Sequence, residues 1–308
     1  MKILVVARCK NGRYAPFIAE QVAALEKEGV DCIYFPIVNN GLIGYIRHLS
    51  KLISVIQKER PDLVHAHFVF SGMLACLQNK VPVVTTFHGS DINEKLLLPL
   101  SRLVMRLSSM SVFVSRQNYE KAKCRRRSCI IPCGVDLDDL QLTGKPIARR
   151  RMGLDPDIKY ILFAGPFDRA VKNSALAKET VSMLKSERVE LLELKGYSRD
   201  EVTLLLCAVD ALLMTSLNEG SPQIIKEALA CGCPIVSVDV GDVRERVDGI
   251  EGCYVSVYPS SKELKMLLIK ALGFSGKTDG RNRLISDGLD NMLIAKALKG
   301  VYECCLRN

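Results

Sequence analysis

Residues 212–232 read LLMTSLNEGSPQIIKEALACG, and this stretch decides how the second half of the chain folds. Its apolar start is typical of a buried strand, and a short polar turn follows. We expect Ser221 to cap the next helix and Pro222 to take its first position, while Gly232 ends it. The pattern therefore predicts one strand-turn-helix unit of a parallel α/β sheet.

The start of this helix is suited to bind an anion. Free backbone N–H groups and the positive end of the helix dipole point in the same direction, which suits a pyrophosphate. Glu219 on the turn is placed to bind sugar hydroxyls, and Glu227 in the second helical turn is placed to reach a ribose. Because glutamate is more often a solvated surface residue, the spacing alone leaves both interpretations open.

Strand-like and helical patterns alternate along the whole chain. In the first half we predict strands at residues 1–7, 32–36, 63–66, 81–86, 112–114 and 129–132, and helices at 16–28, 44–57 and 95–107. In the second half we predict strands at 160–164, 189–194, 211–214, 234–238 and 253–255, and helices at 175–184, 199–207, 222–231 and 262–272. Continuous apolar strands between helices indicate parallel sheets that are covered on both faces. The expected fold is therefore α/β, with two Rossmann-like, doubly wound domains that face each other across a ligand-binding cleft.

Residues 136–157 are the best candidate for a linker, because glycines and prolines interrupt them and they have no apolar period. We therefore expect an N-terminal, acceptor-side domain at 1–143 and a donor-binding domain at 144–308. A last helix is expected at about 289–306, and it is predicted to pack back on the first domain. Its apolar face is expected to carry Leu293, Ala297, Val301 and Cys304.

Length and composition indicate an ordinary globular protein. The chain has 308 residues, of which 48% are hydrophobic and 25% are charged, so two domains are expected. No apolar run approaches the roughly 18 residues of a membrane span, and the opening run is too short for a signal peptide. We therefore expect a cytoplasmic protein.

Neither the cysteines nor the paired aspartates predict a metal site. The 12 cysteines are dispersed over the chain without Cys-x2-Cys spacing, and reduced thiols are the expectation. Asp136 with Asp138, and Asp155 with Asp157, have a spacing that Mg²⁺-dependent transferases use, yet both pairs lie in the expected linker. We interpret them as turn residues and predict a metal-independent protein without a cofactor.

The net positive charge of the chain comes entirely from its first half. Residues 1–150 hold 22 Lys and Arg against 12 Asp and Glu, whereas the remainder holds 21 against 22. The basic run at 121–127 and the pattern at 95–107, with Arg102 and Arg106 one helical turn apart, predict contact of residues 1–150 with an anionic membrane. An ordinary core helix with two exposed arginines is the alternative. An aromatic content of 6% without Trp offers little stacking surface, so nucleic acid is not an expected partner.

The segment that contains Glu219 and Glu227 resembles the signature of glycosyltransferase family 4, whose members are retaining enzymes with the GT-B fold. Other segments fit that family in the same order along nearly the whole chain. They are LVHAHF at 63–68, HGSD at 88–91, IPCGVD at 131–136, FAG at 163–165, KN at 172–173 and DVGD at 239–242.

The resemblance implies a role for each matching residue. Glu227 would bind the donor ribose, Glu219 would bind sugar hydroxyls, and Lys172 would neutralise the diphosphate. Breaking the anomeric bond puts charge on the leaving phosphate, so cations and N–H groups aimed there stabilise it most. His88 would lie near the transferred sugar, although a histidine that is hydrogen-bonded within a loop is the alternative. The other donor-binding residues would be Gly12, Arg169, Gly196, Gly220, Ser221 and Pro222.

Two positions depart from the family pattern. The family has an arginine directly after the glycine of FAG, whereas this chain has its arginine at 169, three positions further on. Arg169 is therefore only a candidate substitute. The first loop has a single glycine, Gly12, where the family has a pair, which weakens a donor contact there.

The resemblance implies a retaining glycosyltransferase that moves a sugar from a nucleoside diphosphate sugar to a glycan or lipid-linked acceptor. Cell-surface polysaccharide synthesis is the expected process, and the inner face of the plasma membrane is the expected place. A nucleotide-sugar 2-epimerase of the same fold is one alternative. A non-enzymatic basic adaptor for membranes or nucleic acid is the other.

Overall fold

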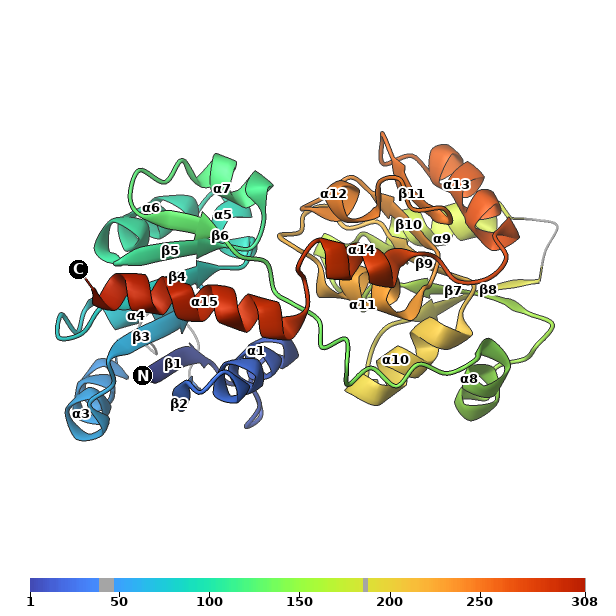
Figure 1. The fold of residues 1–308 in the computed structure, drawn as a ribbon. Helices are drawn as coiled ribbons and strands as arrows, with labels where there is room; N and C mark the ends of the chain where they lie inside the picture. Colours follow the sequence, from blue (N-terminus) through green and yellow to red (C-terminus); the bar gives the residue numbers. More distant parts are fainter. Residues whose placement is uncertain (39–46, 185–187, 308) are drawn as a thin grey trace. The chain divides into compact units, whose positions relative to one another are not determined.

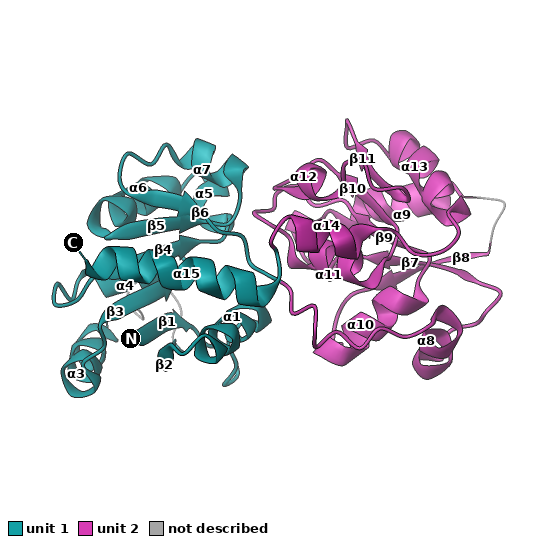
Figure 2. Cartoon of the chain, in the orientation of Figure 1, with its two compact units in different colours: residues 1–134, 289–308 teal, residues 135–288 magenta. Residues whose placement is uncertain are grey.

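The computed structural model describes residues 1–38, 47–184 and 188–307, which form two compact units (Figure 1). Unit 1 comprises Met1–Gly134 and Leu289–Asn308, and unit 2 comprises Val135–Gly288 (Figure 2). Each unit is built on one parallel sheet whose strands are connected through helices. The expected α/β class and the two parallel sheets are confirmed.

The sheet of unit 1 has the strand order β2-β1-β3-β4-β5-β6, and every neighbouring pair is parallel. Its strands are β1 (Lys2–Arg8), β2 (Asp31–Ile37), β3 (Leu63–His67), β4 (Val83–Phe87), β5 (Met110–Phe113) and β6 (Ser128–Ile130). Its helices are α1 (Pro16–Lys27), α3 (Leu49–Glu59), α4 (Val69–Cys76), α5 (Ser90–Asn93), α6 (Leu98–Leu107), α7 (Arg116–Ala122) and α15 (Asn291–Leu306).

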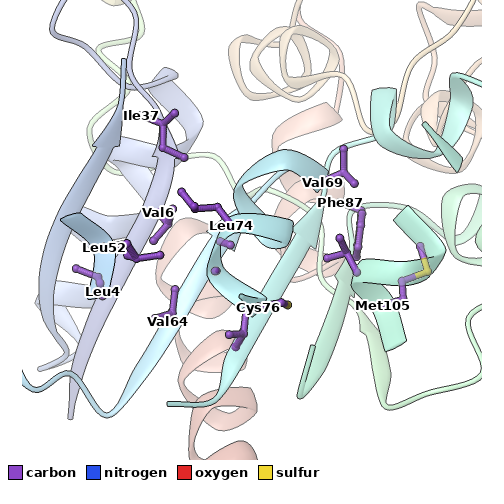
Figure 3. Packing of buried hydrophobic residues seen from close by; sticks show 14 of the residues in the cluster. Leu4, Val6, Ile37, Leu52, Val64, Val69, Leu74, Cys76, Phe87 and Met105 are labelled. Atoms are coloured by element: carbon purple, nitrogen blue, oxygen red, sulfur yellow. The ribbon is translucent and has the colours of Figure 1, made fainter. Parts of the chain in front are cut away.

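Helices cover both faces of the unit 1 sheet. Side chains of a strand point alternately to the two faces, so neighbouring residues of one strand enter different layers. On one face, Leu4 and Val64 pack with Leu52 of α3 in a buried apolar cluster (Figure 3). On the other face, Nδ1 of His65 lies 2.7 Å from the hydroxyl oxygen of Tyr302 in α15. The sheet is therefore doubly wound.

The sheet of unit 2 has the strand order β11-β10-β9-β7-β8 and is also parallel throughout. Its strands are β7 (Lys159–Phe163), β8 (Val189–Glu193), β9 (Ala211–Met214), β10 (Ile235–Val238) and β11 (Cys253–Ser256). Its helices are α8 (Lys145–Met152), η1 (Ala170–Lys172), α9 (Ser174–Ser182), α10 (Arg199–Ala208), α11 (Gln223–Cys231), α12 (Val243–Val247), α13 (Ser261–Gly273) and α14 (Gly280–Ser286). Phe163, Leu213 and Leu264 belong to its buried apolar core.

The expected linker at 136–157 contains helix α8, so that expectation is wrong. Gly144 is the N-cap residue of the helix, and Gly153 is its left-handed C-cap at φ 67°. The glycines that suggested a linker therefore mark the ends of a helix. Arg149 anchors this helix, because its Nη2 lies 2.7 Å from Oδ2 of the buried Asp210. The division between the units falls at 134/135 instead of 143/144.

The last helix belongs to unit 1, but its buried face differs from the expected one by one residue. Leu293, Ala297 and Cys304 are exposed and Val301 is only partly buried. The buried residues are Asn291, Ile294, Ala295, Leu298, Tyr302 and Cys305. One residue is about 100° of rotation on a helix, so a difference of one residue turns another side of the helix towards the sheet. The buried side carries Tyr302, which is hydrogen-bonded with His65, and periodicity in a helix with apolar residues on several sides did not reveal this contact.

Several short helices were not predicted, among them α4, α5, α7, α12 and α14. Helix α4 is buried on most sides and therefore has no amphipathic period to detect. For the helix expected at 44–57, residues 44–46 lie outside the described residues, and α3 begins at Leu49. No helix within residues 1–38, 47–184 and 188–307 is long and apolar enough to span a membrane.

Candidate functional site

The strand order of unit 2 locates its ligand site. From β7 the chain goes outward to β8 and then returns to β9 on the other side of β7. This reversal is a topological switch point, and open parallel sheets bind ligands at the carboxyl ends of the strands that flank it. The loops after β7 and β9 are therefore the expected ligand-binding loops, and they carry Lys172 and Glu219.

Gly165 allows the side chain of Lys172 to lie close to the backbone at the end of β7. A Cβ atom at position 165 would come within 3.0–3.1 Å of three carbon atoms of the lysine side chain. Gly165 also has a φ of 153°, which non-glycine residues rarely adopt. A larger residue here would push the lysine away from the switch point.

Lys172 and Glu219 form an ion pair across the switch point. The lysine Nζ lies 2.8 Å from Oε1 of the glutamate, and the side chains are only 15% and 18% exposed. Thr215 fixes the loop that carries the lysine, because its hydroxyl donates to the carbonyl oxygens of Lys172 and Asn173 at 3.0 and 2.9 Å. The two residues expected to meet the diphosphate and the sugar are thus neighbours.

The turn before α11 differs from the expectation in two details, because Pro222 is not the first helical residue and Ser221 is not the cap. The N-cap residue is Pro222, and no side chain caps the helix, so Ser221 is not the cap. The Ser221 hydroxyl instead lies 2.8 Å from Oδ2 of Asp242. Gly241 packs against the same turn, since a Cβ atom there would lie 2.7 Å from the carbonyl oxygen of Gly220. The N-cap side chain therefore makes no capping hydrogen bond at the start of α11, and the positive end of a helix is a site that suits an anion.

Glu227 is buried in the second turn of α11 and forms an ion pair with Arg199. The glutamate side chain is 7% exposed and the arginine side chain is 37% exposed. Arg199 is the first residue of α10, whose start is fixed by a capping box between Ser198 and Glu201. The carboxylate expected to bind the ribose is therefore oriented by a cation from the neighbouring helix.

His88 follows β4 in unit 1, and both of its ring nitrogens have neighbours. Its Nε2 lies 3.0 Å from Nδ1 of His67, and its Nδ1 lies 3.9 Å from Sγ of Cys133. The His88 ring packs against those of Phe68 and Phe17, with centroids 4.5 and 4.9 Å away. These contacts fix the ring at the carboxyl edge of the sheet, where strands of this type present ligand-binding residues.

Three buried titratable groups lie on this part of the unit 1 sheet, and two of them, His67 and Asp91, contact His88 directly. Burial lowers the pKa of His65 to about 3. Burial also lowers the pKa of His67 well below its usual value, and the neighbouring His65 and His88 rings add to this effect. Asp91 accepts hydrogen bonds from the backbone N–H groups of Val69 and His88, yet burial raises its pKa to about 6. His65 and His67 are therefore neutral at pH 7.

The remaining expected donor-binding residues are less enclosed. Arg169 is exposed and lies directly before η1, which ends at Lys172. Gly196, at φ 84°, follows β8, and Gly12, at φ 74°, lies in a turn closed by two hydrogen bonds between Lys10 and Arg13. Neither glycine has an atom within 4 Å of an added Cβ, so its backbone conformation is the only requirement for glycine. Gly12 belongs to unit 1 and the other two belong to unit 2.

The Asp-x-Asp pairs are turn residues, as expected. Oδ1 of Asp136 accepts from the N–H of Asp139 at 3.0 Å, and Oδ1 of Asp155 accepts from the N–H of Asp157 at 2.8 Å. Within the part of the chain that the structure describes, no group of three or more His, Cys, Asp or Glu side chains is arranged to hold a metal ion.

Two ion pairs of this site were not predicted from the sequence. The role of Arg199 was missed, although the Ser198–Glu201 capping signal could have placed it at the start of a helix. Arg246 was also missed; its Nε lies 3.1 Å from Oδ2 of Asp242, which is nearly inaccessible to solvent. The spacing of Asp242 and Arg246 by four residues on a helix was the available signal.

Comparison with known families agrees with this geometry. Residues 6–139 match the family model described as Glycosyltransferase Family 4, and residues 155–272 match the model described as Glycosyl transferases group 1. Together the two matches cover most of both units. TuaC of Bacillus subtilis, which is named provisionally as a teichuronic acid biosynthesis glycosyltransferase, is 28% identical over 228 residues. That match covers 64% of this chain and 59% of TuaC, so the chain aligns with less than two thirds of that relative.

Solved structures share the fold over nearly the entire chain. Sucrose-phosphate synthase from Thermosynechococcus elongatus has a TM-score of 0.81 at 13% identity, with 98% of each chain covered. Anabaena Alr3699/HepE in complex with UDP and glucose has a TM-score of 0.74 at 16% identity, with 98% of this chain and 99% of HepE covered. At such identities the likeness concerns the fold alone. With the two family matches, these findings establish that the chain belongs to the group 1 glycosyl transferases of glycosyltransferase family 4 and has the GT-B fold.

Proposed function

We propose that the protein is a retaining glycosyltransferase that moves a sugar from a nucleoside diphosphate sugar to a glycan or lipid-linked acceptor. The observation that carries this proposal is the Lys172–Glu219 pair at the switch point of unit 2, beside a helix start without a side-chain cap. A bound diphosphate would be a stronger partner for Lys172 than one carboxylate, because it carries more charge and meets the helix N-terminus as well. Structures of HepE with UDP and with UDP-glucose support a donor of this class.

Donor binding then changes the partner of each residue in the pair. The Lys172 ammonium turns to the diphosphate and stabilises the charge that develops there as the anomeric bond breaks. Glu219 is released by the same exchange and becomes available to accept hydrogen bonds from sugar hydroxyls. The N–H groups of Gly220 and Ser221 add donors to the leaving group. Arg169, on the same loop as Lys172, is a further candidate cation for the diphosphate.

Glu227 is assigned to the donor ribose, and Arg199 acts as its positioning residue. A carboxylate can accept from both ribose hydroxyls, provided that it stays ionised and correctly oriented. The Arg199 ion pair restricts the side chain. His88 is assigned to the transferred sugar, since its ring is fixed at the carboxyl edge of the unit 1 sheet.

The acceptor is proposed to lie at a membrane. Basic groups are concentrated in residues 1–150, and the inner leaflet of the plasma membrane is the anionic surface that would attract them. Synthesis of a cell-surface polysaccharide fits this placement, and the name of TuaC supports it. The reaction is proposed to need no metal ion, because a lysine and a helix start serve the diphosphate.

Acceptor-dependent release of nucleoside diphosphate tests the reaction. UDP-, GDP- and ADP-sugars are incubated with and without membrane-derived acceptors, and NMR spectroscopy determines the anomeric configuration of the product. We expect nucleotide release only with acceptor, and the donor configuration to be kept. Release without acceptor together with an epimerised sugar would identify the 2-epimerase instead. Absence of binding to every nucleotide sugar would favour the non-enzymatic adaptor.

A further inference from the structure

Unit 1 contains a basic cavity that the proposed transfer reaction does not use. Its volume is about 440 Å³, and its lining contains no acidic residue. The cationic pocket, as we name it, is defined by Arg102, Arg106, Lys123, Arg125 and Arg126, with Met105 and Cys124 between them.

The charges of the cationic pocket are not neutralised within the described chain. None of its five basic side chains takes part in an ion pair among residues 1–38, 47–184 and 188–307. Arg102 is held by its Nε, which donates to the carbonyl oxygen of Ala122 at 3.2 Å. Like charges gathered around one cavity repel one another and create a strongly positive local potential. Such a cavity attracts an anion from outside the chain.

The cationic pocket lies away from the candidate catalytic edge of its sheet. Helix α6 leads into β5, and the loop at 123–127 leads into β6, so both approach the amino ends of their strands. His88 instead follows the carboxyl end of β4. A strand of five residues separates these edges by roughly 16 Å. The pocket is therefore a second anion site and not a part of the arrangement around His88.

The exposed face of α6 adds apolar surface next to the charges. Leu103 is 43% exposed and Leu107 is 51% exposed, and they directly follow Arg102 and Arg106 in the sequence. Leu96, just before this helix, is 93% exposed. A free phosphate ion would make no use of exposed leucines, whereas helices that lie in the headgroup region of a bilayer combine arginines with leucines in this way. The apolar neighbours thus favour a lipid over a soluble anion.

We propose that the cationic pocket binds the phosphate headgroup of an anionic phospholipid while Leu103 and Leu107 enter the lipid interface. The pocket then anchors unit 1 to a membrane and leaves the carboxyl edge of the sheet available for substrate. This inference rests on the proposed function only in placing a transferase at a membrane, because no residue of the cationic pocket is assigned to donor binding.

Vesicle co-sedimentation of the intact protein tests the proposal. Vesicles rich in phosphatidylglycerol are compared with pure phosphatidylcholine vesicles, for the wild type and for three double variants: Arg102→Gln with Arg106→Gln, Arg125→Gln with Arg126→Gln, and Leu103→Ser with Leu107→Ser. Each lost charge near an anionic bilayer should weaken binding about fivefold, so each arginine pair should weaken it roughly 25-fold. The Arg125/Arg126 variant keeps the hydrogen bond of Arg102. A loss of vesicle binding in this variant therefore cannot be attributed to the loss of that bond.

The matched control is Arg150→Gln with Arg151→Gln, which removes two exposed arginines from α8 in unit 2. It lowers the net charge equally and should leave vesicle binding within about twofold, as expected for screened charges outside the cationic pocket. An equal loss in this control, or equal binding of the wild type to both vesicle types, would overturn the proposal. So would serine variants that bind vesicles as the wild type does.

A soluble anion is tested separately with inorganic phosphate in a thermal-shift assay. Stabilisation by phosphate that disappears in the Arg102/Arg106 variant, without any vesicle binding, would assign the pocket to a free phosphate and refute the lipid. A nucleotide-sugar thermal shift on every variant reports on donor binding, to which no residue of the cationic pocket is assigned. Absence of that shift in the wild type would contradict the proposed function. The vesicle experiment would still test the cationic pocket by itself.

Discussion

In unit 2 the charged residues of the candidate site are paired, whereas in unit 1 the five residues of the cationic pocket have no ion-pair partner within the described chain. Lys172 pairs with Glu219, and Arg199 pairs with Glu227. A ligand of unit 2 must therefore replace an existing partner, and it succeeds only when its charge and geometry exceed those of a carboxylate. The cationic pocket has no such competitor and accepts anions with less discrimination. The comparison thus separates specific donor recognition from general attachment.

The largest effect is expected from Lys172→Ala. Removing one preorganised donor to a charge that develops in the transition state lowers kcat about 100- to 1000-fold. The matched control is Lys195→Ala, because Lys195 also pairs with a carboxylate in unit 2, but its pair with Asp168 is more than half exposed on both sides. An exposed pair contributes little, so the control should keep nearly full activity. Equal kcat values in the two variants would refute the role of Lys172.

The two glutamates should separate turnover from nucleotide binding. Glu219→Ala should mainly lower kcat, and Glu227→Ala should mainly raise the dissociation constant of the nucleotide. Each change should correspond to about 1–3 kcal/mol of free energy, as expected for a lost charged hydrogen bond. Glu245→Ala, an exposed glutamate on α12, is the control and should change neither constant. Wild-type kinetics and affinity in both site variants would contradict the assignment.

Acid should destabilise the fold through the buried histidines of unit 1. The pKa of His65 is lowered to about 3 by burial, and that of His67 is lowered too, so the unfolded chain binds protons more readily below pH 6.5. Each such group costs about 1.4 kcal/mol of unfolding free energy per pH unit as pH falls from about 6.5 towards the folded pKa. Asp91 acts in the opposite direction between about pH 6 and 4, because its pKa is raised to about 6.

Urea unfolding measured from pH 7 to 5 checks this balance of two histidines against one aspartate. The wild type should lose stability on acidification, and His65→Gln should show a smaller slope even though it is less stable at pH 7. A stability that stays constant or rises between pH 7 and 5 would show that the histidines do not control it.

The smallest effect is expected from removing metal ions. Glycosyl transfer should survive EDTA, since Lys172 and the start of α11 meet the diphosphate. If chelation abolished the activity and Mg²⁺ or Mn²⁺ restored it, Lys172 and the start of α11 would not be sufficient to neutralise the diphosphate.

Periodicity and helix signals predicted the alternating strands and helices of both sheets, because buried parallel strands are short continuous apolar runs. The family pattern led to Lys172, Glu219 and Glu227, and the structure pairs the first two. Contacts between side chains that are far apart in the sequence could not be predicted from it. The contact of Arg199 with Glu227 joins two helices, and a single sequence contains no signal for such a contact.

Local signals also failed where a tertiary contact decided the outcome. Ser221 looks like an N-cap residue, yet its hydroxyl binds Asp242 from the next loop. Helix α15 has apolar residues on several sides, and its buried side is the one that carries Tyr302, which is hydrogen-bonded with His65. The glycines around α8 indicated an interruption correctly, but they mark the ends of a helix rather than a linker.

The central claim is that the Lys172–Glu219 pair opens to bind a nucleoside diphosphate sugar, and a thermal-shift comparison tests it most directly. A ligand at 100 times its dissociation constant stabilises the native state by about 2.7 kcal/mol, which raises the unfolding temperature measurably. We predict that one of the UDP-, GDP- or ADP-sugars raises the unfolding temperature of the wild type and of Lys195→Ala, but not that of Lys172→Ala. An equal rise in all three proteins, or no rise in the wild type with any of these donors, would contradict the account.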